Sequence, residues 1–311
     1  MNGWNLIQKL FAPGDPKDNE LSNPVNLAAP LRTRRHIAYR EFGDPEGANI
    51  LLCIPCILES QNSFDELVTY VQNHTGCRLI TVDHCGRGRS DWLDDDHSYK
   101  MSIYLEDLRT LITHLHATHK RLIRRLYLLG SGMGALLAMN LAAQHALRVK
   151  GLILNDLGLT LSWSGLFLLY GNTGDSIAHE RALESFIKMR FDPRLIQAIS
   201  HPSHVDIDYH FNFRGIHFDN VIHDFEGSVL LIRGEHSETC EKLDELVVTQ
   251  FVKNVDVLEI AGETHPVRYR PEVLSRLSEI LDLKKKTIGV CAEAFSSNFR
   301  KLDVYALLAC K

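Results

Sequence analysis

Short apolar segments alternate with longer amphipathic segments along most of this chain, and this order constrains the fold more than any other feature. The strand-length segments are residues 36–42, 50–54, 78–82, 125–129, 149–154, 228–233 and 255–260. The helix-length segments, where apolar side chains recur at helical spacing, are residues 63–73, 102–115, 134–144, 241–251 and 271–281. Strands that alternate with helices require crossover connections. We therefore predict an α/β fold with a doubly wound, mostly parallel sheet.

The alternation is lost in one segment, residues 160–222, which is rich in His, Phe, Asn and Gly. We predict that residues 36–159 and 223–283 form one core, and that residues 160–222 are inserted between its halves as a helical cap. Residues 1–35 are predicted to be an N-terminal arm and residues 284–311 a C-terminal tail. Ligands of such folds bind at the carboxyl ends of the strands, so we expect the functional site there.

Composition and charge narrow the class of protein. The chain has 311 residues, 45% of them apolar, and a net charge of -5, which argues against a nucleic-acid partner. Its seven cysteines are scattered and odd in number, which favours reduced thiols and a cytoplasmic location. No leader peptide and no membrane span are predicted. The histidine spacings offer no common ligand face, so we predict no metal site and no cofactor. The sequence leaves open whether the chain binds a protein partner, and it does not predict the oligomeric state.

One glycine-rich run, Leu128–Ala135 (LLGSGMGA), follows an apolar strand and opens an apolar helix. This context is typical of a nucleophile elbow, the G-x-S-x-G turn that presents a serine to a substrate. Gly130 and Gly134 occupy the outer positions, where strand and helix approach too closely for a side chain. The central residue, which should be the serine, is Gly132.

Four further segments occur in a fixed order around this run: DHCGRGRS at residues 83–90, GLILND at 151–156, LIRGEHSE at 231–238 and AGETHP at 261–266. Together with the elbow they resemble the α/β-hydrolase superfamily, in particular its esterase-like and C–C-hydrolase-like members with a cap. The resemblance covers roughly residues 36–282. It implies the α/β-hydrolase fold and a catalytic triad in the order nucleophile, acid, histidine.

The resemblance implies a triad of Gly132, Glu238 and His265. A glutamate can orient an imidazole as an aspartate does. Gly132 has neither hydroxyl nor thiol, so ordinary serine hydrolysis is not expected.

The oxyanion hole also departs from the superfamily pattern. The backbone N–H groups of Met133 and Ile57 would form it. Cys56 stands where the superfamily's H-G-x loop has glycine, a residue that frees the backbone for strained conformations. We expect the N–H of Met133, which begins the helix, to keep this role, whereas the N–H of Ile57 follows Cys56 in place of the usual glycine.

These residues leave several functional hypotheses open. The first is a pseudo-hydrolase that binds a small apolar or carbonyl-bearing molecule, or a protein partner. The second is an enzyme in which His265 and Glu238 act as a general base pair without a covalent intermediate. The third is a weak esterase that uses Ser131, although a shift of one residue in the turn should point that side chain away from the histidine. Cys56 is a further candidate nucleophile, but a reactive thiol needs electropositive, exposed surroundings that the sequence does not show.

Overall fold

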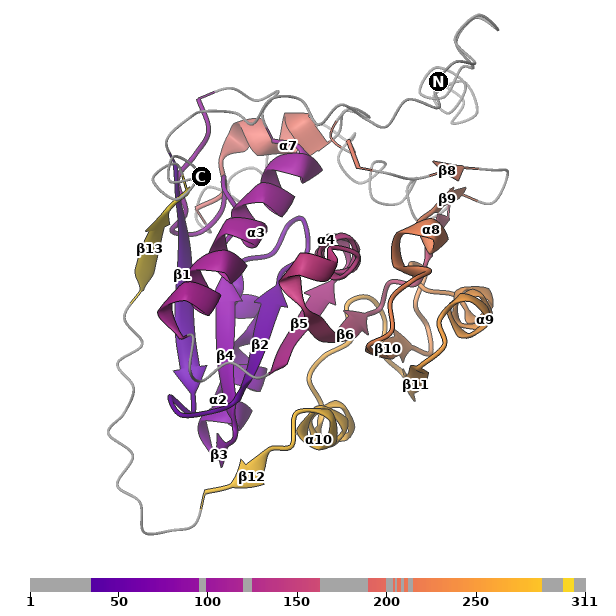
Figure 1. The fold of residues 1–311 in the computed structure, drawn as a ribbon. Coiled ribbons are helices and arrows are strands. Elements are labelled where there is room, and N and C mark those ends of the chain that lie inside the picture. The colour runs from indigo at the N-terminus through magenta and orange to yellow at the C-terminus, as the bar shows by residue number, and fades with distance from the viewer. Residues whose placement is uncertain are drawn as a thin grey trace, which may run out of the picture.

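The computed structural model describes residues 35–94, 99–119, 125–162, 190–199, 204, 206–207, 210–211, 215–286 and 299–304. An eight-stranded sheet forms the centre, in the order β11-β10-β6-β5-β2-β4-β1-β13 (Figure 1). Its strands are β1 (His36–Gly43), β2 (Asn49–Ile54), β4 (Cys77–Val82), β5 (Arg125–Ser131), β6 (Val149–Asn155), β10 (Ser228–Gly234), β11 (Val255–Ile260) and β13 (Arg300–Asp303). The strands from β4 to β11 are parallel, and β1 and β13 run antiparallel to their neighbours. The predicted doubly wound, mostly parallel sheet is confirmed.

Helices cover both faces of this sheet. The helices are α2 (Asp65–Gln72), α3 (Met101–Thr118), α4 (Met133–Ala142), α9 (Lys242–Phe251) and α10 (Pro271–Ile280), with 3-10 turns at Gln61–Phe64 and His145–Leu147. Successive strand residues point to opposite faces. Accordingly Leu52 and Leu128 pack in the core that includes α3 and α4, while Leu51 and Leu129 pack in the core that includes α2 and α10. These strands are buried on both faces, which explains their continuous apolar character.

The segment that was predicted as a cap, residues 160–222, is described only in part. Its described residues include three short strands, which pair antiparallel in the order β7-β9-β8, and two helices. These elements are β7 (Thr160–Ser162), α7 (Pro193–Ile199), β8 (His210–Phe211), β9 (Gly215–His217) and α8 (Asp219–Ile222). The described part of the segment is therefore not purely helical, and its boundaries as a cap stay a prediction.

The predicted C-terminal tail contributes to the sheets. Lys284–Lys285 (β12) pairs with His74–Thr75 (β3), and β13 pairs with β1 at the edge of the main sheet. The sequence analysis did not predict β13, because its four residues carry three charges and only one buried apolar side chain, Leu302. Such a charged strand is typical of a sheet edge. Within the described ranges no helix combines the length and apolar character needed to cross a membrane.

Candidate functional site

The glycine-rich run forms a tight turn between β5 and α4. Gly132 caps the helix with φ +50° and ψ -118°, a conformation that L side chains rarely adopt. A Cβ added at Gly130 would lie 2.2 Å from the carbonyl oxygen of Gly134, and one added at Gly134 would lie 2.1 Å from that of Ile54. Both outer positions therefore admit only glycine, which is the close approach expected of a nucleophile elbow.

Two reactive side chains surround the place where a side chain at residue 132 would begin. An ideal Cβ on Gly132 would lie 2.4 Å from Cys56 Sγ and 3.2 Å from His265 Nε2. The turn at Gly132 therefore faces the imidazole ring of His265. The space in front of the ring is taken by the sulfur of Cys56, and Cys56 itself lies just beyond the end of β2.

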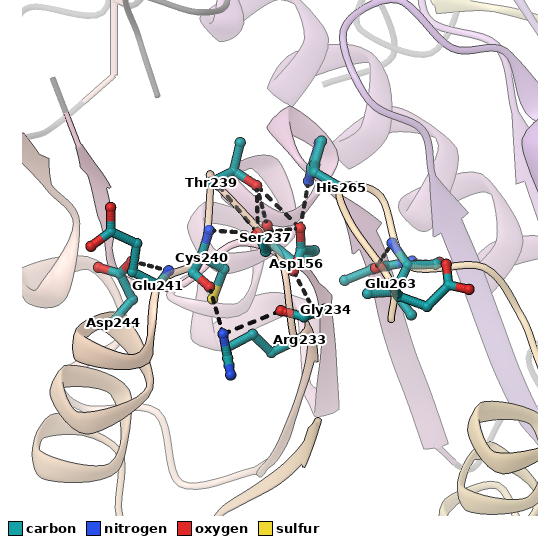
Figure 2. A network of polar contacts seen from close by, with 12 residues as sticks. Asp156, Arg233, Gly234, Ser237, Thr239, Cys240, Glu241, Asp244, Glu263 and His265 are labelled. Carbon is teal, nitrogen blue, oxygen red and sulfur yellow. Dashed lines mark hydrogen bonds and ion pairs between the residues drawn. The ribbon is translucent and has the colours of Figure 1, made fainter. Parts of the chain in front are cut away.

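His265 is held by a buried carboxylate, that of Asp156. His265 Nδ1 and Asp156 Oδ2 are 2.9 Å apart, and the Asp156 side chain is fully buried. Asp156 also accepts hydrogen bonds from the Gly234 N–H (2.9 Å), the Ser237 hydroxyl (2.7 Å) and the Thr239 hydroxyl (3.1 Å). Figure 2 shows these groups converging on the carboxylate. A buried carboxylate is stable only when donors satisfy it in this way.

The prediction that Glu238 orients His265 is wrong, because the hydrogen bond goes to Asp156. Strands β6 and β10 are neighbours, and the Asp156 N–H donates to Ile232 O at 2.8 Å, which places its carboxylate beneath the loop that follows β10. Glu238 lies in that loop and is exposed, while its neighbours Ser237 and Thr239 turn inward to donate to Asp156. The end of β10 and the loop after it therefore supply donors that hold the acid, and the acid itself directly follows β6.

A signal for Asp156 was present in the sequence. It directly follows β6, at the edge of the sheet where the carboxyl ends of the parallel strands meet. The resemblance implies only a core strand for the segment GLILND and gives no role in the site to its final carboxylate. Asp156 has a left-handed backbone conformation, with φ +58°, which Asp tolerates better than most residues. This conformation turns the chain out of the strand.

The neighbour of this acid, Asn155, fixes the loop that carries the histidine. Its side-chain amide donates to Val267 O at 2.9 Å, and its side-chain oxygen accepts from the Val267 N–H at 3.1 Å. This two-point contact ties the end of β6 to the chain two residues beyond His265. The sequence analysis missed Asn155 as well.

The hydrogen bonds around His265 change its acidity. Burial lowers the pKa of the ring, but the hydrogen bond with Asp156 and the interaction with the nearby Cys56 sulfur outweigh burial and raise the pKa to about 10. The ring is therefore protonated near neutral pH. A neutral imidazole, which a simple general base requires, would be scarce there.

Hydrogen bonds fix the turn that carries Cys56 and Ile57. The Cys56 N–H donates to Glu59 Oε2 at 2.9 Å, and Arg87 Nε donates to Ile57 O at 2.7 Å. The Cys56 N–H is thus already used. Met133 is the first residue of α4, so its N–H has no acceptor within the helix. The oxyanion role of Met133 and Ile57 stays a prediction.

Ser131 points to a different place. It is buried, and its hydroxyl has no hydrogen-bond partner among the described residues. It lines a cavity together with Asn155, Pro266 and Tyr269, and His265 is not among the lining residues.

The described ranges contain no group of three or more His, Cys, Asp or Glu side chains that could hold a metal ion.

Comparisons with known proteins add three kinds of likeness. A family model described as serine aminopeptidase, S33, matches residues 46–155, which span β2 to β6 and include the elbow. The 3-hydroxybutyrate-oligomer hydrolase of Cupriavidus necator is 32% identical over 142 residues. That match spans 46% of this chain and 45% of the relative, so the likeness covers less than half of either protein.

Solved structures resemble a larger part of the chain. A putative hydrolase from Rickettsia typhi has a TM-score of 0.60 at 21% identity, over 80% of this chain and 91% of its own. An α/β hydrolase from Novosphingobium aromaticivorans has a TM-score of 0.63 at 20% identity, over 80% and 94%. E-2-(acetamidomethylene)succinate hydrolase has a TM-score of 0.57 at 21% identity, over 80% and 98%. At these identities the likeness is one of fold.

Proposed function

This chain has the α/β-hydrolase fold, and we propose that it acts on a small carbonyl-bearing molecule at the His265–Asp156 pair without using a serine nucleophile. The observation that carries the proposal is the 2.9 Å contact between His265 Nδ1 and a fully buried Asp156, with Nε2 3.2 Å from the place where a side chain at residue 132 would begin. The other ring nitrogen thus faces the point where a serine hydroxyl would attack in a serine hydrolase.

We propose a carboxylic ester as the substrate. The relative from Cupriavidus necator is named as a hydrolase of 3-hydroxybutyrate oligomers, which are joined by ester bonds. A protonated His265 can donate a proton to the leaving alcohol of such an ester, and Asp156 stabilises the charged ring while it does so. Short 3-hydroxybutyrate oligomers are therefore the first compounds to test.

The experiment combines turnover with a serine-directed probe. Purified protein is incubated with p-nitrophenyl butyrate and with 3-hydroxybutyrate dimers and trimers, with and without a fluorophosphonate. We expect turnover that the fluorophosphonate does not block, that His265→Ala abolishes, and that Glu238→Gln leaves unchanged. Fluorophosphonate labelling of the wild-type protein at Ser131, with loss of turnover, would contradict the proposal.

One observation favours a second candidate, a pseudo-hydrolase that binds such a molecule without converting it. The elbow has no hydroxyl at Gly132, so the attack that begins serine hydrolysis has no donor there. This candidate predicts that 3-hydroxybutyrate oligomers raise the midpoint of thermal unfolding while no product forms. A weak esterase through Ser131 has no support from the geometry, because the Ser131 hydroxyl lines a cavity that does not include His265.

A further inference from the structure

We infer that the Cys56 thiol is the nucleophile of this site and that Cys56, His265 and Asp156 form a triad that attacks carboxylic esters. The inference rests on the proposed function and names the attacking group that the proposed function leaves open. It moves the nucleophile from the end of β5, where the superfamily pattern has it, to the turn that follows β2.

The position of the sulfur is the first argument. A Cβ on Gly132 would lie 2.4 Å from Cys56 Sγ and 3.2 Å from His265 Nε2, so the sulfur fills the space that a side chain at residue 132 would need. Strands β2 and β5 are neighbours with Ile54 beside Gly130, so their carboxyl ends lie side by side. Cys56 is therefore two residues past a strand end that adjoins the elbow.

The second argument is that a side chain at residue 132 and the thiol exclude each other. A separation of 2.4 Å between the Cβ and the sulfur is shorter than real contacts allow, so the thiol would have to leave its position if a serine stood at the elbow. Glycine at residue 132 is what lets Cys56 reach His265. On this interpretation Gly132 makes room for a different nucleophile.

The third argument comes from the contacts of the thiol. Cys56 Sγ and His265 Nε2 both lie close to the Cβ position of Gly132. Interaction with Asp156 and with the Cys56 sulfur raises the pKa of His265 to about 10, so the ring carries a proton near the sulfur at neutral pH. Cys56 is only half-buried, whereas the other described cysteines (Cys53, Cys77, Cys85 and Cys240) are buried. Burial raises the pKa of each of those four thiols, which makes them poor nucleophiles.

The reaction balances without any group that is absent from the site. The thiol proton resides on His265, and the Cys56 sulfur forms a bond to the acyl carbon of the ester. The bond from that carbon to the alkoxy oxygen breaks, and His265 gives its proton to the leaving alcohol. Water then attacks the thioester while His265 accepts a proton. The carboxylic acid leaves, and the ring again holds the proton beside the free sulfur, as at the start.

The direct test looks for the thioester. Wild-type protein is mixed with p-nitrophenyl acetate, quenched in acid and mapped by peptide mass spectrometry with fragment ions that separate Cys53 from Cys56. We expect an acetyl group on Cys56, and none on that residue in His265→Gln. Iodoacetamide should alkylate Cys56 at least about 10-fold faster in the wild type than in His265→Gln, because the ring activates the thiol.

Turnover separates this inference from the proposed function. We expect Cys56→Ala to lose at least about 10²-fold in kcat/KM for p-nitrophenyl butyrate, as loss of a nucleophile does, while Glu238→Gln does not change it. Full turnover in Cys56→Ala, combined with its loss in His265→Ala, would overturn the inference and leave the proposed function standing. Unchanged turnover in both variants would overturn both. Wild-type protein that shows no acetyl group on Cys56 also overturns the inference, whatever the turnover.

Discussion

The two halves of this site differ in how much of the fold holds them. Asp156 and His265 depend on a buried carboxylate that Gly234, Ser237 and Thr239 satisfy together. The nucleophile half depends on the residue type at two single positions, glycine at 132 and cysteine at 56. Removing a partner from a buried charge is expensive, whereas removing a hydroxyl from a turn leaves no charge uncompensated. The chemistry of the first half is therefore fixed by the fold, and the second half is free to move from one strand end to the next.

The variant Asp156→Asn should give the largest effect, because it removes the charge on which the His265–Asp156 half of the site (the fixed half) depends. In serine proteases the corresponding change lowers kcat about 10⁴-fold, and we expect a loss of about 10³–10⁴-fold in kcat/KM here. Breaking one partner of a buried pair also costs about 3–5 kcal/mol in the free energy of unfolding. Steady-state kinetics and urea unfolding measure the two effects.

The matched control for this change is Glu238→Gln, which neutralises a carboxylate in the adjoining loop. Since Glu238 is exposed and His265 bonds to Asp156, neither activity nor stability should change measurably. Equal losses in the two variants would mean that Glu238 contributes to the site as much as Asp156 does, and the comparison between the halves would lose its basis.

A pair of substitutions should return the nucleophile half to the superfamily pattern. Cys56→Gly together with Gly132→Ser removes the sulfur and places a hydroxyl beside His265 Nε2. We expect this double variant to react covalently with a fluorophosphonate, which the wild-type protein should not do. Gly132→Ser alone should label far less, because Cys56 still occupies the space that the serine needs. Labelling is read by intact-protein mass spectrometry.

Strong fluorophosphonate labelling of Gly132→Ser with Cys56 in place would contradict the claim that the thiol and a side chain at residue 132 exclude each other. It would mean that the thiol yields its position freely and does not compete for the ring.

A smaller effect should follow when the thiol is displaced without supplying a hydroxyl. Gly132→Ala places a Cβ 2.4 Å from Cys56 Sγ, so the sulfur must leave His265, and alkylation of Cys56 by iodoacetamide should slow about 10-fold. Gly262→Ala is the matched control, since Gly262 has a similar φ of +70° but nothing within 4 Å of its added Cβ. It imposes comparable backbone strain without moving the thiol, so the alkylation rate should be unchanged.

The sequence predicted the fold better than the site, and for a physical reason. Buried parallel strands and amphipathic helices are read from local patterns, so the core elements lie within a few residues of their predicted ranges. The partner of His265 depends instead on which strand ends meet. Asp156 and Glu238 both follow strand ends, and only the pairing of β6 with β10 decides that Asp156 lies beneath the ring. The closeness of Cys56 to Gly132 likewise follows from the pairing of β2 with β5, which the order of residues along the chain does not reveal.

The smallest effect is a slope of stability against pH that the charged ring of His265 should cause. Its pKa is about 10 in the folded protein and about 6.5 when unfolded, so the folded state holds the proton more tightly. The stabilisation is fully present below about pH 6.5 and is lost as pH rises to about 10. His265 is 24% exposed, and after allowance for solvent screening we expect a difference of about 1–2 kcal/mol from His265→Gln. Urea unfolding at several pH values, followed by tryptophan fluorescence, measures this difference. Cys56→Ala should keep the part of the slope that Asp156 causes and lose the part that the thiol causes. A difference between wild type and His265→Gln that stays constant from pH 6.5 to 10 would show that the ring is not held as a cation by the fixed half of the site.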